Sequence, residues 1–190
     1  DMMAAVETFG SALKTTAPDR AFPSLRGHPP AVELGASLDV PSSLERPETG
    51  IELGIPATTE AVHVAAPLVY YLGADVVPAA TPSIRTTDGF HYPLSGPDGY
   101  ERAVERTLKQ VFFLDCVTRT EGLYGIDLHE RAAMDRVLDM DFASLYDRPM
   151  AAQLEAYLDV PYDLIADHGP EWKLTTHVEP APSTVEQLPY

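Results

Sequence analysis

Apolar residues follow a helical period over residues 97–122, which is the longest regular pattern in the chain. They recur every three or four residues and define one predicted face, made of Tyr100, Ala103, Val104, Leu108, Val111, Phe112 and Cys116. Asp98 is a suitable N-terminal cap, Gly122 a suitable end, and Glu105 and Lys109 have the spacing of a favourable ion pair. We therefore expect a long helix at the centre of the fold.

The residues before this helix predict a strand, a helix and a second strand. Ile51–Ile55 alternates in the manner of a strand, a helix capped by Thr58 or Thr59 follows and ends at Gly73, and residues 74–79 form a short buried strand. The unit covers about 28 residues, which is long enough for a crossover between two parallel strands. Asp88-Gly89 then lies between strand-like residues 83–86 and 90–94 and predicts a hairpin.

These elements predict a single α/β domain over residues 1–190, with a small mixed sheet built from one βαβ unit and a hairpin. The long helix and shorter C-terminal helices pack on this sheet. Further helices are expected at residues 2–14, 127–138 and 150–158, and further strands at residues 31–34 and 172–178. Prolines make three segments irregular, at about residues 15–30, 39–49 and 179–190.

The charge balance changes the picture most. The chain has 29 acidic and 13 basic residues, a net charge of −16, and only three lysines. Such a charge repels phosphate backbones and anionic lipid, so we expect no nucleic-acid or membrane partner. No apolar run approaches the roughly 18 residues that a bilayer requires. The single cysteine, Cys116, allows no internal disulfide, which fits a reducing cytoplasm.

Abundant carboxylates with few lysines are typical of proteins from salt-loving archaea. On this composition and on segments such as LRGHPPAVELG, VYYLGADVVP, QVFFLDCVTRTEGLYGIDLHERAA and WKLTTHVEP, the chain resembles an uncharacterised protein family of halophilic archaea. The resemblance implies no activity and no catalytic residues. Because the sequence starts at Asp1 and stops after LPY, we expect a piece of a longer protein. Its partners would be other domains of that protein or a separate protein.

Cys116 raises the possibility of catalysis by a thiol. VFFLDC is similar to the strand that carries the nucleophile in caspase-like peptidases, and His63 lies 53 residues earlier, near the caspase spacing. However, Val64 follows His63 where that family has glycine, and the helical period continues through Cys116. The alternative interpretation is a cysteine that packs as a small apolar residue.

A polar cluster at the end of the long helix offers a second hypothesis. Asp115 and Arg119 are four residues apart and can form an ion pair, or Arg119 can bind an anion from a ligand. Glu121, Tyr124 and His129 are further candidates for ligand binding here. His129-Glu130 begins like the zinc motif HExxH, but Ala133 replaces its second histidine. We therefore expect no metal, and the lack of glycine-rich phosphate-binding motifs predicts no cofactor.

Three functions stay open. The first is a non-catalytic interaction or regulatory domain of a larger cytoplasmic protein. The second is a caspase-like cysteine hydrolase that uses Cys116 and His63, and the third is a domain that binds a small anionic ligand near Arg119.

The charge leads to a first testable prediction. In molar salt the screening length is about 3 Å, so repulsion between carboxylates further apart than this is largely removed. The melting temperature should therefore rise steeply from low salt to molar KCl. Thermal unfolding followed by circular dichroism over a KCl series measures this. A melting temperature insensitive to molar KCl would count against a halophilic origin.

Overall fold

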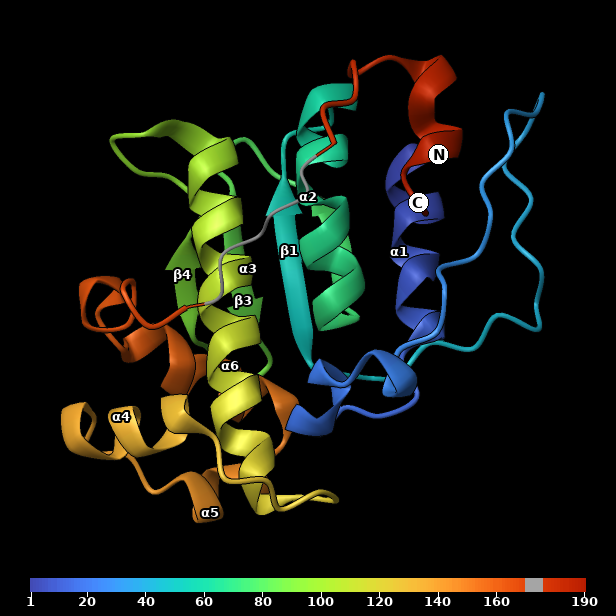
Figure 1. The fold of residues 1–190 in the computed structure, drawn as a ribbon. Helices are drawn as coiled ribbons and strands as arrows, with labels where there is room; N and C mark the ends of the chain where they lie inside the picture. Colours follow the sequence, from blue (N-terminus) through green and yellow to red (C-terminus); the bar gives the residue numbers. More distant parts are fainter. Residues whose placement is uncertain (170–175) are drawn as a thin grey trace.

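A four-stranded mixed sheet with helices on one side forms the fold (Figure 1). The structure is a computed structural model, and it describes residues 1–169 and 176–190. The strands are β1 (Ile51–Ile55), β2 (Asp75–Pro78), β3 (Ser83–Thr86) and β4 (His91–Pro93), in the order β2-β1-β3-β4. β1 and β2 are parallel, whereas β1–β3 and β3–β4 are antiparallel. The predicted βαβ unit and hairpin are both confirmed.

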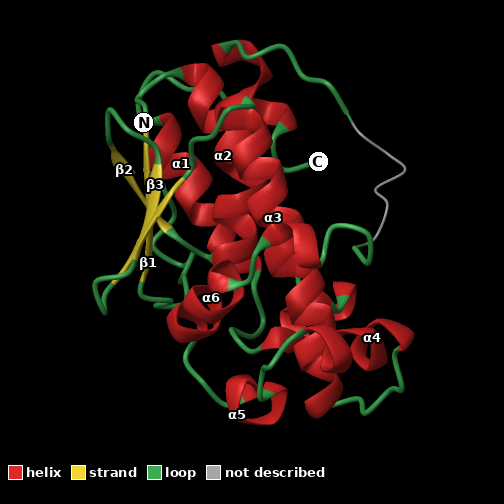
Figure 2. Ribbon diagram, turned by 90° about the vertical axis from the view of Figure 1, so that its left-hand side faces the viewer, coloured by secondary structure: helices red, strands yellow, loops and turns green. Residues whose placement is uncertain are grey.

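Alternation along the strands gives the sheet one apolar face and one polar face. Leu53 pairs with Ile84 in the register, and both are buried. The neighbouring pair, Glu52 and Arg85, points to the other face and forms an ion pair at 3.5 Å. Figure 2 shows the strands at one side of the molecule, with the helices packed beside them. The core therefore lies between a single sheet face and the helical layer.

Two helices run side by side across this layer. α2 (Thr59–Leu72) is capped by Thr58, whose hydroxyl accepts from the Ala61 amide at 3.2 Å, and Gly73 ends it with φ +52°. α3 (Gly99–Thr118) is the predicted long helix and lies in front of the sheet in Figure 1. Among the described residues, no helix combines the length and apolar character needed to cross a bilayer.

Shorter helices complete the layer at both ends of the chain. α1 (Met2–Glu7) packs against α2, and α6 (Met150–Asp159) packs against α3. α4 (His129–Val137) and α5 (Phe142–Tyr146) lie beyond the C-terminal end of α3. Short 3-10 turns occupy Pro18–Ala21 and Pro23–Leu25 in the first proline-rich segment and Pro182–Gln187 in the last one. Residues 39–49 are irregular, as predicted.

The end of α3 is fixed by a close approach rather than by an unusual backbone angle. Gly122 follows the 3-10 turn Arg119–Glu121 and has φ −97°, which any residue can adopt. A Cβ there would lie 2.5 Å from the Tyr146 ring and 2.7 Å from a carboxylate oxygen of Asp19. Any larger residue at this position would have to displace the Tyr146 or Asp19 side chain.

The buried surface of α3 is wider than the predicted stripe. Ala103, Val104 and Val111 are buried, but the four other residues of the predicted face are only half-buried: Tyr100, Leu108, Phe112 and Cys116. The helix also buries Thr107, Gln110, Asp115 and Thr118. It contacts α2, α4, α5, α6 and the turn Pro18–Ala21, so it is covered on several sides and not on one.

Several other expectations need correction. The helix predicted over residues 2–14 becomes a 3-10 helix at Thr8–Ala12, where Gly10 approaches the backbone of Gly73. Residues 31–34 form no strand, and β2 is a partly exposed edge strand instead of a buried one. The strand predicted over residues 172–178 lies largely outside the described residues.

Candidate functional site: a buried ion pair and a cleft on helix α3

The buried side of α3 carries an ion pair that joins the N-terminal segment to this central helix. Both carboxylate oxygens of Asp115 lie 2.8 Å from Nη2 of Arg20, and both side chains are fully buried. The hydroxyl of Tyr71, from α2, donates to Asp115 at 2.7 Å. Tyr157, from α6, donates to Thr118 at 2.9 Å, one helical turn further along α3.

Arg20 connects this pair to α6 and to the N-terminal segment. Its Nη1 donates to the carbonyl of Thr16 at 2.7 Å and to Oε1 of Gln153 at 3.3 Å. The amide nitrogen of Gln153 then donates to three carbonyls of the α5–α6 connection: Leu145, Tyr146 and Arg148. Arg20 Nε is buried and has no hydrogen-bond partner within the described residues. Gln153 thus gives hydrogen bonds to backbone carbonyls that would otherwise be buried without a partner.

Burial governs the electrostatics of this network. It raises the pKa of Asp115 to about 6, although Arg20 opposes the shift. It also raises the pKa values of Tyr71 and Tyr157 well above the usual tyrosine range, with the Asp115 charge adding to the effect. At neutral pH the pair is thus a carboxylate and a guanidinium, with two neutral phenols beside it.

The predicted pair of Cys116 and His63 is not brought together. Tyr100 donates to the carbonyl of Ala61, and Tyr71 donates to Asp115, so α2 and α3 run in the same direction. His63 precedes Tyr71 by eight residues, which places it about 12 Å away along α2 from the level of Cys116.

The surroundings of both side chains agree with this separation. The His63 ring nitrogens contact the Thr59 carbonyl at 2.8 Å and the Thr184 hydroxyl at 3.2 Å. Burial raises the pKa of the Cys116 thiol to about 11. A thiolate nucleophile needs the opposite shift.

The residues predicted at the end of α3 make structural contacts. Arg119 does not pair with Asp115, because Arg20 occupies that carboxylate. The Arg119 guanidinium lies 3.9 Å from the centre of the Phe22 ring. Tyr124 packs edge-on against the same ring at 5.2 Å. Glu121 forms an ion pair with Arg131 at 2.6 Å, and His129 is exposed.

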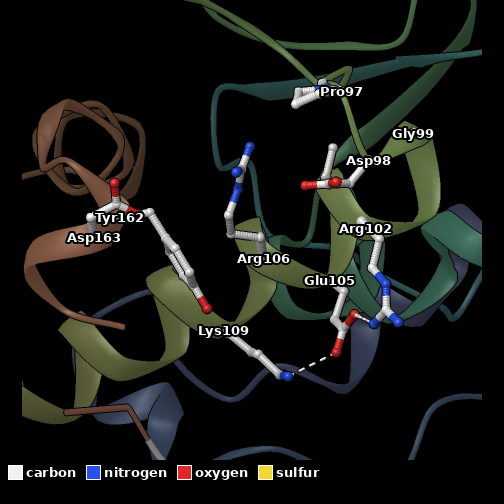
Figure 3. Close-up of a pocket in the computed structure, with 11 residues that line it drawn as sticks. Pro97, Asp98, Gly99, Arg102, Glu105, Arg106, Lys109, Tyr162 and Asp163 are labelled. Carbon is white, nitrogen blue, oxygen red and sulfur yellow. Dashed lines mark hydrogen bonds and ion pairs between the residues drawn. The ribbon is translucent and has the colours of Figure 1, made fainter. Parts of the chain in front are cut away.

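A cleft lies instead at the N-terminal half of α3, and we call it the α3 cleft (Figure 3). It has a volume of about 360 Å³ and is lined by residues 96–99, by Arg102, Glu105, Arg106 and Lys109 of α3, and by Tyr162 and Asp163. Glu105 binds two of the three cations: Arg102 at 2.6 Å and Lys109 at 2.7 Å. The third cation, Arg106, extends into the cleft beside Tyr162.

Arg106 is held by an aromatic ring and not by an acid. Its guanidinium lies 5.7 Å from the centre of the Tyr162 ring, and Nη2 lies close to Gly96. Across the described residues, no hydrogen bond or ion pair engages its side chain. Asp98 caps α3 only by position, since its side chain accepts no bond from the first turn. The cleft thus offers the Arg106 guanidinium to an anion, beside the acidic residues Asp98 and Asp163.

The sequence contains a signal for this cleft. Arg102, Arg106 and Lys109 have i, i+4, i+7 spacing, so they share one face of α3. Tyr162, which lies 56 residues after Arg106, could not be assigned to this face from a helical pattern. In residues 1–169 and 176–190, no group of three or more acidic, histidine or cysteine side chains is placed to hold a metal ion.

Comparison with known proteins found no family model that matches the chain, no similar curated protein and no similar solved structure.

The geometry of Cys116 gives a second prediction. With a pKa of about 11, only about one thiol in a thousand is ionised at pH 8, so a thiol-specific reagent should react slowly. The labelling rate should rise about tenfold per pH unit toward pH 11, because the fraction of thiolate rises about tenfold per pH unit below the pKa. Stopped-flow labelling over a pH series measures this rate, and H63A should leave it unchanged.

The denatured chain is the control, since its thiol has an ordinary pKa. Fast labelling of the folded protein at pH 7 that is lost in H63A would instead favour the hydrolase hypothesis.

Proposed function

We propose that this chain is a non-catalytic regulatory or interaction domain of a larger cytoplasmic protein, and that it binds a small anion in the α3 cleft. The observation that carries the proposal is Arg106, a half-buried arginine that faces the cleft without an acidic partner in the described part of the chain. In a protein of net charge −16, an arginine left without a carboxylate is available to an anionic ligand.

The contacts of Arg106 are suited to ligand binding. The guanidinium lies within cation–π distance of the Tyr162 ring, 5.7 Å from its centre, and its N–H groups have no hydrogen-bond partner among the described residues. Those groups match the geometry of a carboxylate or phosphate, which they bind in pairs. Arg102 and Lys109 both pair with Glu105, and three acids balance the three cations of the cleft lining, so Arg106 itself carries the proposal.

The non-catalytic part of the proposal is supported by the state of the reactive groups. Cys116 has a raised pKa, His63 is hydrogen-bonded on both ring nitrogens, and Asp115 is closed off in the core. Asp115 and His63 are thus engaged in contacts within the chain, and the Cys116 thiol is not activated. A ligand-dependent domain attached to other domains is therefore a simpler account than a hydrolase, and it keeps the expectation of partners in a longer chain.

The proposal predicts that inorganic phosphate binds and that Arg106 controls the affinity. R106Q should weaken phosphate binding by about tenfold or more, because a charge-assisted contact of about 1.5–3 kcal/mol is lost. Calorimetric titration at a fixed KCl concentration measures the affinity. Amide shifts at Gly96 and Gly99 in two-dimensional NMR locate the bound ion.

R85Q is the matched control, because Arg85 is an arginine on the open face of the sheet, far from the cleft in the fold. It should bind phosphate as the wild type does. Equal affinities for wild type and R106Q, or no phosphate binding by the folded wild type, would contradict the proposal.

A further inference from the structure

A second cavity lies between the N-terminal segment, α2 and α3, and we call it the Arg26 groove. Its volume is about 470 Å³, within the range of small-molecule sites. Its walls are mostly apolar and come from the N-terminal segment, α2 and α3: Pro23, Pro67, Tyr70, Tyr71, Leu108 and Phe112. The charged side chain that lines it is Arg26.

Arg26 is placed over two rings of this groove. Its guanidinium carbon lies 5.4 Å from the centre of Tyr71 and 5.6 Å from the centre of Phe112. Its side chain has no hydrogen bond or ion pair to any part of the chain that the structure describes. These two cation–π contacts leave the N–H groups of the guanidinium without a partner, so they can pair with a carboxylate.

The groove is held in shape by bonds behind its walls. Tyr71 is fixed because its hydroxyl donates to Asp115, and Phe112 packs edge-on against Tyr71 with ring centres 5.8 Å apart. The hydroxyl of Tyr70 donates to the carbonyl of Gly27 at 2.7 Å, which ties the N-terminal segment to α2. A ligand would therefore enter a largely preformed site and lose little free energy to ordering it.

We infer that the Arg26 groove binds a small aromatic carboxylate. Proline and aromatic walls favour a flat apolar body, and burial of such a body contributes roughly 25 cal/mol per Å². A single guanidinium at the wall selects one negative group on that body. An inorganic anion would leave the apolar walls unused, and a neutral hydrocarbon would leave Arg26 unpaired. The site is separate from the α3 cleft and does not depend on the function proposed there.

The test uses 2-naphthoate and its neutral analogue 2-naphthamide, titrated at fixed KCl concentration and followed by calorimetry. Wild type should bind 2-naphthoate at least tenfold more tightly than 2-naphthamide. R26Q should lose that preference, because the variant keeps the walls and removes the charge. Amide shifts at Gly27 and Leu108 should identify the groove as the place of binding.

R106Q is the matched control, since it removes an arginine of the α3 cleft and leaves the groove intact. It should bind 2-naphthoate as the wild type does, and inorganic phosphate should not displace 2-naphthoate. R26K keeps the positive charge but lacks the paired N–H groups of the guanidinium. We expect it to bind 2-naphthoate with an affinity between those of the wild type and R26Q. Equal binding of the two naphthalene compounds, unchanged affinity in folded R26Q, or no binding of 2-naphthoate would overturn the inference.

Discussion

The ion pair between Arg20 and Asp115 is the constraint on which the rest of the structure depends. It joins a proline-rich N-terminal turn to the middle of the core, and Gln153 extends it to α6. Removing two charges from water is costly, and a pair of this kind is stable only when its geometry and further hydrogen bonds offset that cost. Tyr71, Thr16 and Gln153 supply those bonds. Hence a proline-rich segment with only short 3-10 turns is joined to the core through Arg20.

Both candidate sites depend on this pair through α3. Asp115 holds the hydroxyl of Tyr71, and the Tyr71 ring is a wall of the Arg26 groove. Arg106 lies on the same helix, about 14 Å from Asp115 along its axis, and reaches the α3 cleft on an exposed side. The buried acid on α3 is thus fully engaged inside the chain, whereas the two arginines proposed to bind ligands, Arg106 on α3 and Arg26 in the N-terminal segment, have no acidic partner among the described residues.

Local patterns allowed the sheet and the main helices to be predicted, because alternation, Thr58, Gly73 and Asp88-Gly89 act over a few residues. The partner of Asp115 could not be predicted in this way. Arg119 is four residues away on the same helix, yet Arg20, 95 residues earlier, takes the carboxylate because tertiary packing brings it into the core. The same limit applies to the α3 cleft: the i, i+4, i+7 spacing of Arg102, Arg106 and Lys109 is visible in the sequence, but the position of Tyr162 beside them is not.

A double-mutant cycle on Arg20 and Asp115 tests the central claim most directly. Urea unfolding of wild type, R20M, D115N and the double variant in high KCl measures the four free energies of unfolding. We predict that each single variant loses about 3–5 kcal/mol, since each leaves one buried group unpaired. The double variant should lose at least about 2 kcal/mol less than the sum of the two single losses. Single losses below about 1 kcal/mol, or losses that add within about 0.5 kcal/mol, would contradict the account.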